Sequence, residues 1–173
     1  MLPHCGTVKR RFLALFLAAL AGLAGGCKPA ASDPLLPTEV QPRLATIKIY
    51  LGPREITAEV ARTEWQQRCG MMFRTNIGEN EGMIFLLPQP MQASFWMKNC
   101  PQPLSAAYID PQGTIEEIHP LQPQDTNPVV ATSGNIQYVL ETAQGWFERN
   151  GITTGAVITT EKGSLGQTFW GKQ

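Results

Sequence analysis

One short segment of the sequence carries residue types that could bind a ligand on the surface of a strand. Alternation along residues 93–97 places Phe95 on one face and Trp96, together with the following Lys98, on the other. An indole beside an ammonium group could stack on a sugar or another ring and meet an anion. The same pair could instead be a half-buried tryptophan with the lysine stem packed along it. Both interpretations stay open from the sequence.

Three further polar residues are candidates for the same site. Asn99 follows the predicted strand, where its amide would close a turn or contact a ligand. Arg74 follows a predicted helix and could cap its carbonyls, pair with Glu79 or Glu81, or anchor an anion. His119 is a lone histidine, which is weak evidence for catalysis and gives no pair for a metal site. We therefore assign no catalytic residue.

No other motif points to a cofactor or a metal. The sequence contains no glycine-rich phosphate loop, no Gly-x-Ser-x-Gly and no paired-histidine zinc signature. Its methionines, including Met71, Met72 and Met83, are more typical of core packing than of a metal-binding stripe. We therefore expect neither a cofactor nor a metal.

Residues 1–26 have the order of a cleavable export signal: a positive segment at 9–11, an apolar run at 12–23, then small residues before Cys27. A cysteine directly after Leu-Ala-Gly-Gly resembles a lipobox, in which diacylglycerol is attached to the thiol. The apolar run reaches about 18 Å as a helix, well short of a hydrocarbon core of about 30 Å. An ordinary signal peptide and a stable anchor helix remain the alternatives.

These features predict a lipoprotein anchored through Cys27 and facing the periplasm or the cell exterior. Lys28 follows the cysteine, in place of the aspartate linked to inner-membrane retention, which gives a weak preference for the outer membrane. Acids and bases balance over the whole chain, and the signal removes three bases and no acid. The mature chain therefore lacks a basic patch, and we expect no binding to nucleic acid.

The mature chain divides into a Pro-rich linker at 27–44, a β domain at 45–162 and a Gly-rich tail at 163–173, where Phe169 and Trp170 could dock on the domain. Thr63 is a candidate N-cap for a short helix that ends near Gly70, and Gly151 would close a second helix at 143–150. The predicted strands are 46–51, 56–60, 83–87, 93–97, 104–109, 114–118, 136–141 and 156–160. Many short strands, with one helix after the first hairpin and one near the C-terminus, favour a single mainly β sandwich or squat barrel.

Several blocks of the domain resemble one family. They are Gly-Met-Met-Phe-Arg at 70–74, Glu-Gly-Met-Ile-Phe at 81–85, Ser-Phe-Trp-Met-Lys-Asn at 94–99, Pro-Leu-Ser at 103–105, Ile-Asp at 109–110 with Gly113, Ile-His at 118–119 and Tyr-Val-Leu-Glu at 138–141. In this order, over roughly residues 45–160, they resemble the family called domain of unknown function 192. The resemblance implies a mainly β, jelly-roll-like sandwich and no established activity. Two positions depart from the family pattern: Cys100 stands in place of a threonine and Ser105 in place of an aspartate.

The cysteines left after export predict a disulfide. The signal takes Cys5 and the lipid takes Cys27, so Cys69 and Cys100 would meet an oxidising compartment as a pair. Two alternatives stay open: a pair of buried free thiols, or a reactive Cys100 whose thiolate is favoured by Lys98.

The sequence thus favours a lipid-tethered, single-domain binding module for a small molecule, a glycan or an envelope protein. The alternative is an envelope enzyme that uses Arg74, Lys98, Asn99 and His119 around one polar cleft.

Overall fold

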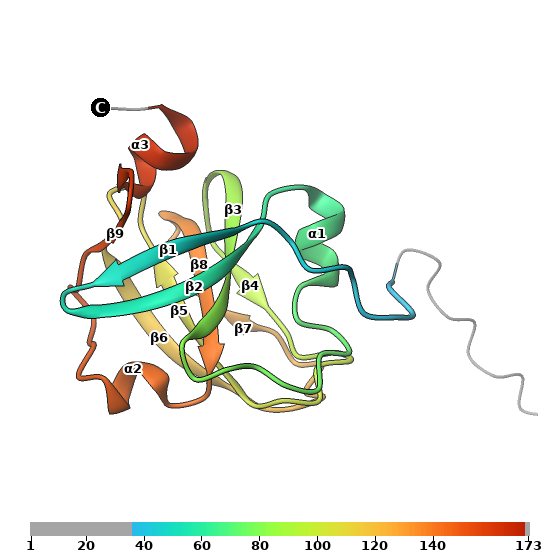
Figure 1. The fold of residues 1–173 in the computed structure, drawn as a ribbon. Coiled ribbons are helices and arrows are strands. Elements are labelled where there is room, and N and C mark those ends of the chain that lie inside the picture. Colours follow the sequence, from blue (N-terminus) through green and yellow to red (C-terminus); the bar gives the residue numbers. More distant parts are fainter. Residues whose placement is uncertain (1–35, 172–173) are drawn as a thin grey trace, which may run out of the picture. The chain divides into compact units, whose positions relative to one another are not determined.

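The computed structural model describes residues 36–171, so the predicted signal and Cys27 lie outside the described residues. Within them, ten strands and three short helices follow one another along the chain (Figure 1). In order they are β1 (Thr46–Leu51), β2 (Arg54–Ala61), α1 (Glu64–Cys69), β3 (Glu81–Met91), β4 (Ser94–Phe95), β5 (Leu104–Ile109), β6 (Ile115–Leu121), β7 (Val129–Val130), β8 (Ile136–Ala143), α2 (Trp146–Arg149), β9 (Ile158–Thr160), β10 (Gly163–Ser164) and α3 (Leu165–Trp170).

The first hairpin and the helix after it form as predicted. β1 and β2 pair antiparallel around a turn at Gly52, whose φ of 58° favours glycine. Thr63 caps α1: its hydroxyl accepts from the backbone N–H of Gln66, and the Gln66 side chain accepts from the backbone N–H of Thr63. Two orphan N–H groups are thereby satisfied, which fixes where the helix begins.

The pairing of β2 with β3 is parallel, in contrast to the other strand pairs of the sheet. Parallel neighbours need a crossover connection, which here contains α1. From β3 the sheet continues antiparallel through β8, β5 and β6. The crossover therefore brings α1 beside the middle of the sheet, next to β3.

The mainly β class is confirmed, but the predicted jelly-roll-like sandwich or closed barrel is not found in residues 36–171. The strands there form one mixed eight-stranded sheet in the order β10-β9-β1-β2-β3-β8-β5-β6 and a two-stranded sheet of β4 and β7. A single isolated bridge, Thr114 to Val157, links the two ends of the large sheet. Strand spacing alone misled the prediction, because it does not reveal that one long sheet curls far enough to supply both walls of the core.

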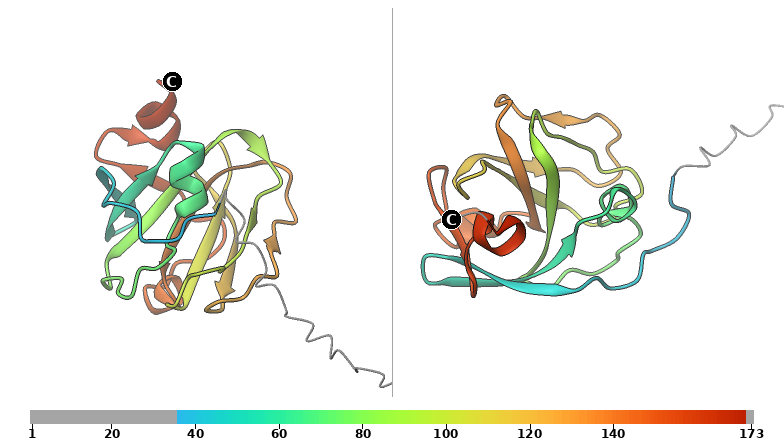
Figure 2. Two further views of the ribbon diagram at one scale, coloured as in Figure 1. Left: turned by 90° about the vertical axis from the view of Figure 1, so that its right-hand side faces the viewer. Right: turned by 90° about the horizontal axis from the view of Figure 1, so that it is seen from above.

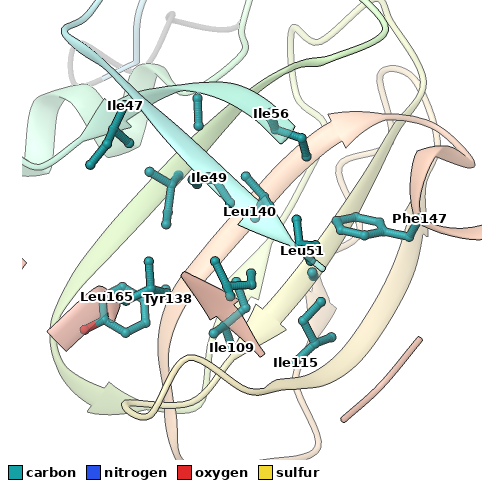
Figure 3. Close-up of a cluster of buried hydrophobic side chains, with 14 of the residues drawn as sticks. Ile47, Ile49, Leu51, Ile56, Ile109, Ile115, Tyr138, Leu140, Phe147 and Leu165 are labelled. Carbon is teal, nitrogen blue, oxygen red and sulfur yellow. The ribbon is translucent and has the colours of Figure 1, made fainter. Parts of the chain in front are cut away.

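Side chains on one face of the large sheet form the first core cluster. Tyr138 and Leu140 of β8 pack there against the apolar face of β1, and Trp146 and Phe147 of α2 cover one end (Figure 3). The predicted alternation of the hairpin is confirmed, since Ile49 and other odd-numbered residues of β1 are buried. This face buries one of the two apolar clusters that stabilise the fold.

The opposite face of β3, β8 and β5 carries a second core cluster. It includes Met83 and Phe85 of β3, Val139 of β8 and Tyr108 of β5. The segment after α1 and the segment around β4 cover this face, with Met72 and other buried methionines among the covering side chains. Alternation along β8 places Glu141 on this same face, two residues beyond Val139.

The C-terminal segment is more ordered than its glycine content suggested. β10 pairs with β9, and α3 follows with a capping box of its own. Phe169 and Trp170 pack against the first core cluster, and the Trp170 indole N–H donates to the Tyr138 hydroxyl at 2.8 Å. α3 lies over one end of the curled sheet, while α2 lies at the other (Figures 1 and 2).

Residues 36–44, the described part of the predicted linker, also contact the domain. The buried Gln41 amide donates to the carbonyls of Gln66 and Gly70 at 3.1 and 2.9 Å. These are acceptors at the C-terminal end of α1, so the linker residue caps the helix. None of the helices described here is long and apolar enough to cross a membrane.

Candidate functional site

A surface cleft of about 320 Å³ is lined by residues of α1 and of the segment around β4. We call it the α1–β4 cleft. Its lining residues are Glu64, Gln67, Arg68, Cys69, Gly70, Met71, Met72, Phe85, Leu87, Ser94, Phe95, Trp96, Cys100 and Glu141. The cleft is mostly apolar, and its charged side chains are few, as in sites that bind small organic molecules.

Local structure at the end of α1 shapes one wall of the cleft. Gly70 ends the helix with a φ of 45°, a conformation that favours glycine. A Cβ atom at this position would lie 3.4 Å from the ring of Phe85, an ordinary contact, so the backbone conformation rather than lack of space favours glycine. Gln67 ties the helix to β3 from the other side, since its amide donates to the carbonyl of Leu86 at 2.6 Å.

Glu141 is the buried carboxylic acid of the cleft. Its side chain projects from β8 between two paired neighbours, Met83 on β3 and Ala106 on β5. The residue is only 4% exposed, and its carboxyl group makes no hydrogen bond or ion pair with the residues of 36–171. Its oxygens are not among the fully enclosed unpartnered atoms, so they keep contact with solvent through the cleft. Burial raises the pKa of Glu141 from its ordinary value of 4.5 to about 8. An uncompensated carboxyl at the base of a cleft is a group still available to a ligand.

The titratable groups nearest Glu141 are neutral at physiological pH. Burial, together with a smaller contribution from the charge of Glu141, raises the pKa of the Cys100 thiol to about 12. Burial likewise raises the pKa of Tyr108, whose hydroxyl donates to the carbonyl of Val129 at 2.6 Å. Lys98 does not line this cleft. A reactive Cys100 thiolate is therefore not what the geometry supports.

Aromatic side chains form the wall opposite α1. Phe95 packs edge-to-face on Phe85, with ring centroids 4.9 Å apart and planes at 82°. Trp96 stands at the rim and is 40% exposed, so it is not a core side chain. The Lys98 ammonium lies 5.4 Å from the centroid of the Trp96 ring. The predicted alternation is confirmed, because Met97 and Phe95 pack in the core cluster while Trp96 points outward.

Arg74 has a structural role. It is 7% exposed, and its guanidinium donates to the Glu59 carboxylate at 2.9 Å. Neither predicted partner is the one it uses: Glu79 pairs with Arg149 at 3.0 Å, and Glu81 lies near a different arginine. Glu59 comes from β2, and no spacing along the sequence linked it to Arg74. The Arg74 Nε has no partner in the described residues, but the arginine does not line the α1–β4 cleft.

Asn99 and His119 also lie outside the cleft lining. Asn99 has a φ of 59° and accepts from the backbone N–H of Phe73 through its carbonyl, as a turn residue does. His119 on β6 hydrogen-bonds the Glu117 carboxylate at 2.8 Å, and its ring packs 5.2 Å from that of Tyr108. Of the five candidate binding residues, only Trp96 lines the α1–β4 cleft.

The structure corrects the predicted disulfide: Cys69 and Cys100 are free cysteines. Both thiols are buried and both line the α1–β4 cleft. Burial raises the pKa of each, so each thiol packs as a small apolar group. The prediction rested on the expected compartment and the number of cysteines, and neither fixes the geometry that a disulfide requires.

Two other clefts have similar volumes, about 370 and 360 Å³. The first is bordered by Arg62 and Phe169, where the guanidinium already lies 5.7 Å from the ring centroid. The second is bordered by Tyr138 and Trp170, whose polar atoms bond each other. The α1–β4 cleft differs from both in holding a buried, unpartnered carboxyl group. Within residues 36–171, no group of three histidine, cysteine or acidic side chains is placed to hold a metal ion.

Sequence reasoning did not single out Glu141. It lies at the end of the predicted strand 136–141. Because it is two residues from Val139, alternation places both side chains on the same face of the strand, which could have indicated that Glu141 is buried. A glutamate on an inward face beside Val, Leu and Tyr has to be paired or functional, because an isolated buried charge is costly. Without the fold, however, the solvent face and the buried face of that strand could not be distinguished.

Comparisons with known proteins give a family and no activity. A crystal structure of a protein of unknown function from Novosphingobium aromaticivorans DSM 12444 matches with a TM-score of 0.64 and 33% identity, over 78% of this chain and 99% of that one. A second, from Sinorhizobium meliloti 1021, is described as a proposed transcription regulator; it matches with a TM-score of 0.66 and 26% identity, over 69% of this chain and 97% of that one. No curated protein matches the chain. The family DUF192, described as "Uncharacterized ACR", matches residues 46–160. The chain therefore belongs to the DUF192 family.

Proposed function

We propose that this protein is a binding module whose α1–β4 cleft holds a small organic molecule. The observation that carries the proposal is the Glu141 carboxyl group, which is buried at the cleft and has no partner in the described residues. A buried polar group without a partner costs stability, and a ligand that supplies the partner recovers that free energy. The volume of about 320 Å³ falls at the lower end of the range for small-molecule sites.

Binding fits this geometry better than catalysis does. A hydrolytic or transfer enzyme needs a nucleophile within hydrogen-bond reach of a base, with donors aimed at the reacting atom. In the cleft, the thiols are neutral and make no hydrogen bond to Glu141. The alternative enzyme site fares no better, because Arg74, Lys98, Asn99 and His119 do not line this cleft.

The proposed location is the cell envelope, with the module tethered by lipid on Cys27. The support comes from the sequence alone: a positive segment, a short apolar run and small residues before the cysteine. A tethered binding module would present the α1–β4 cleft to solutes outside the cytoplasm. We favour a small molecule over a glycan or an envelope protein, because the cleft is small and mostly apolar.

The proposal is tested by screening a library of small organic molecules against the chain from Lys28 onward, which retains both core clusters. Thermal shift finds candidate ligands, and calorimetry measures their dissociation constants. Trp96→Ala and Glu141→Gln should each weaken binding at least tenfold. Trp65→Ala is the matched control, because this tryptophan is 55% exposed and does not line the cleft. A folded protein with no ligand from the library, or ligands indifferent to both cleft variants, would overturn the proposal.

A further inference from the structure

We propose that the ligand of the α1–β4 cleft is an organic ammonium ion, with its ammonium group on the Glu141 carboxylate and its apolar body against the methionines and aromatic rings. This inference rests on the proposed binding function and adds the chemical class of the ligand. It concerns a monocation with a compact hydrocarbon body, such as a primary alkyl or aralkyl amine.

The charges of the cleft favour a cation. Glu141 is its buried ionisable acid, and no base among the described lining residues is free to pair with it. The cationic lining residue, Arg68, is at the rim and donates to the Glu64 carboxylate at 2.9 Å. An anionic ligand would have to compete with Glu64 for Arg68 and would face the Glu141 carboxyl group, whereas an ammonium ion would find its counter-ion in Glu141.

The walls also suit an ammonium ion with an apolar body. The rings of Phe85 and Phe95 offer π faces and edges, and the thioethers of Met71 and Met72 are polarizable. An ammonium group of the protein already makes such a contact near the cleft, since the Lys98 ammonium lies 5.4 Å from the Trp96 ring centroid. Aromatic rings and thioethers around one carboxylate offset much of the hydration free energy that an ammonium ion gives up when it enters the cleft.

A neutral ligand that accepts a hydrogen bond is the competing occupant. Protonated Glu141 could donate to a carbonyl or ether oxygen. The two occupants predict opposite responses to pH, because the ammonium ion needs the carboxylate and the acceptor needs the acid. Among the groups that border the cleft, the pKa values of Cys69, Cys100 and Tyr108 are raised by burial, and the Glu64–Arg68 pair is exposed. Two further groups lie in the same cross-strand row as Glu141, one strand beyond its paired neighbours: Glu59, which pairs with Arg74, and His119, which hydrogen-bonds Glu117.

The pH response follows from linkage. The pKa of Glu141 is about 8 in the free protein, so the carboxylate fraction grows about tenfold per pH unit below that value. The affinity for an amine that is itself protonated should grow in the same way from pH 6 to pH 7 and level off near pH 8. Binding at pH 7 should release about one proton, which calorimetry in buffers of different ionisation enthalpy measures.

The test uses matched probes on the chain from Lys28 onward: 2-phenylethylamine against 2-phenylethanol, and cyclohexylmethylamine against cyclohexylmethanol. At pH 8 each amine should bind roughly 10- to 100-fold tighter than its alcohol, as a charge-assisted hydrogen bond allows. Glu141→Gln should abolish that preference, and Glu148→Gln, which is exposed and does not line the cleft, should keep it. The pH profile and the proton release need no variant, so they test the inference even if Glu141→Gln does not fold.

Equal binding of amines and alcohols, or amine affinity that falls as pH rises, would overturn the ammonium ion while leaving the proposed function in place. Absence of amine binding at pH 8 would overturn it too. The proposed binding function itself falls only if the wider library also yields no ligand that depends on Trp96 and Glu141.

Discussion

Glu141→Gln should stabilise the protein, by an amount that depends on pH. The folded state raises the pKa of this carboxyl group from 4.5 to about 8, so between these values the folded chain holds a proton that the unfolded chain has lost. The stability that this group contributes is therefore fully present below pH 4.5 and is lost as pH rises towards 8, at about 1.4 kcal/mol per pH unit. Glutamine has nearly the same shape and no charge, so it removes this dependence.

The size of the effect follows from the same two pKa values. Relative to its value below pH 4.5, the contribution of Glu141 to the free energy of unfolding is lower by about 3 kcal/mol at pH 7 and by about 4–5 kcal/mol at pH 8. We expect the variant to match the native protein near pH 4.5 and to exceed it by about these amounts at pH 7 and 8. The full value applies because Glu141 is 4% exposed, which leaves little solvent screening.

Urea denaturation at pH 5, 6, 7 and 8 measures the difference in free energy of unfolding, with equal m-values as the check on two-state behaviour. Glu64→Gln is the control, because its side chain is 87% exposed. Its stability curve should run parallel to that of the native protein. If the Glu141→Gln curve runs parallel as well, the carboxyl group is ionised in the native state and the reasoning fails.

The remaining predictions concern the thiols, the rim tryptophan and the lipid. Cys69 and Cys100 should react with a thiol reagent only after denaturation, and then as two thiols without prior reduction; a count of zero would show a disulfide. Trp96→Ala should cost no more than about 1–2 kcal/mol by urea denaturation, whereas Trp146→Ala, fully buried, should cost about 3–5 kcal/mol. A similar loss in both would place Trp96 in the core. Cys27→Ser should abolish incorporation of labelled palmitate, and a variant that still takes it up would contradict the lipid anchor.

The elements that depend on local chemistry could be predicted from the sequence. The β1–β2 hairpin and α1 follow from alternation, a glycine turn and the Thr63 cap, and each forms where expected. Asp110 likewise closes the turn that its Pro-Gln-Gly context indicates, accepting from the backbone N–H of Gln112 and of Thr114. In each case the deciding contacts join residues only a few positions apart.

The features that depend on contacts across the fold could not be predicted. The parallel pairing of β2 with β3 depends on the crossover through α1, and the Arg74–Glu59 ion pair depends on that pairing. The helix α3 was not predicted, because the glycines around it favour a loop, although Ser164 and Gln167 form a capping box at its start. The burial of Glu141 could not be predicted either. It follows from the two core clusters, which cover both faces of β8.

The resemblance to the family supplied an ordered set of blocks and no chemistry, and the structure explains one departure from its pattern. Ser105 accepts a hydrogen bond from the backbone N–H of Gly145 at 3.0 Å, which anchors the start of α2. A serine is sufficient for that contact, and Ser105 does not line the α1–β4 cleft. The other departure, Cys100, does line the cleft.

The most direct test of the central claim is a carbon-13 NMR titration of the Glu141 carboxyl group, assigned by its absence in Glu141→Gln. In the free protein the midpoint should lie near pH 8, as its burial without a partner requires. Saturation with 2-phenylethylamine should lower the midpoint by one unit or more, because the bound ammonium ion favours the carboxylate. A midpoint near 4.5 that the amine leaves unchanged would contradict both the buried, unpartnered acid and the ligand site built on it.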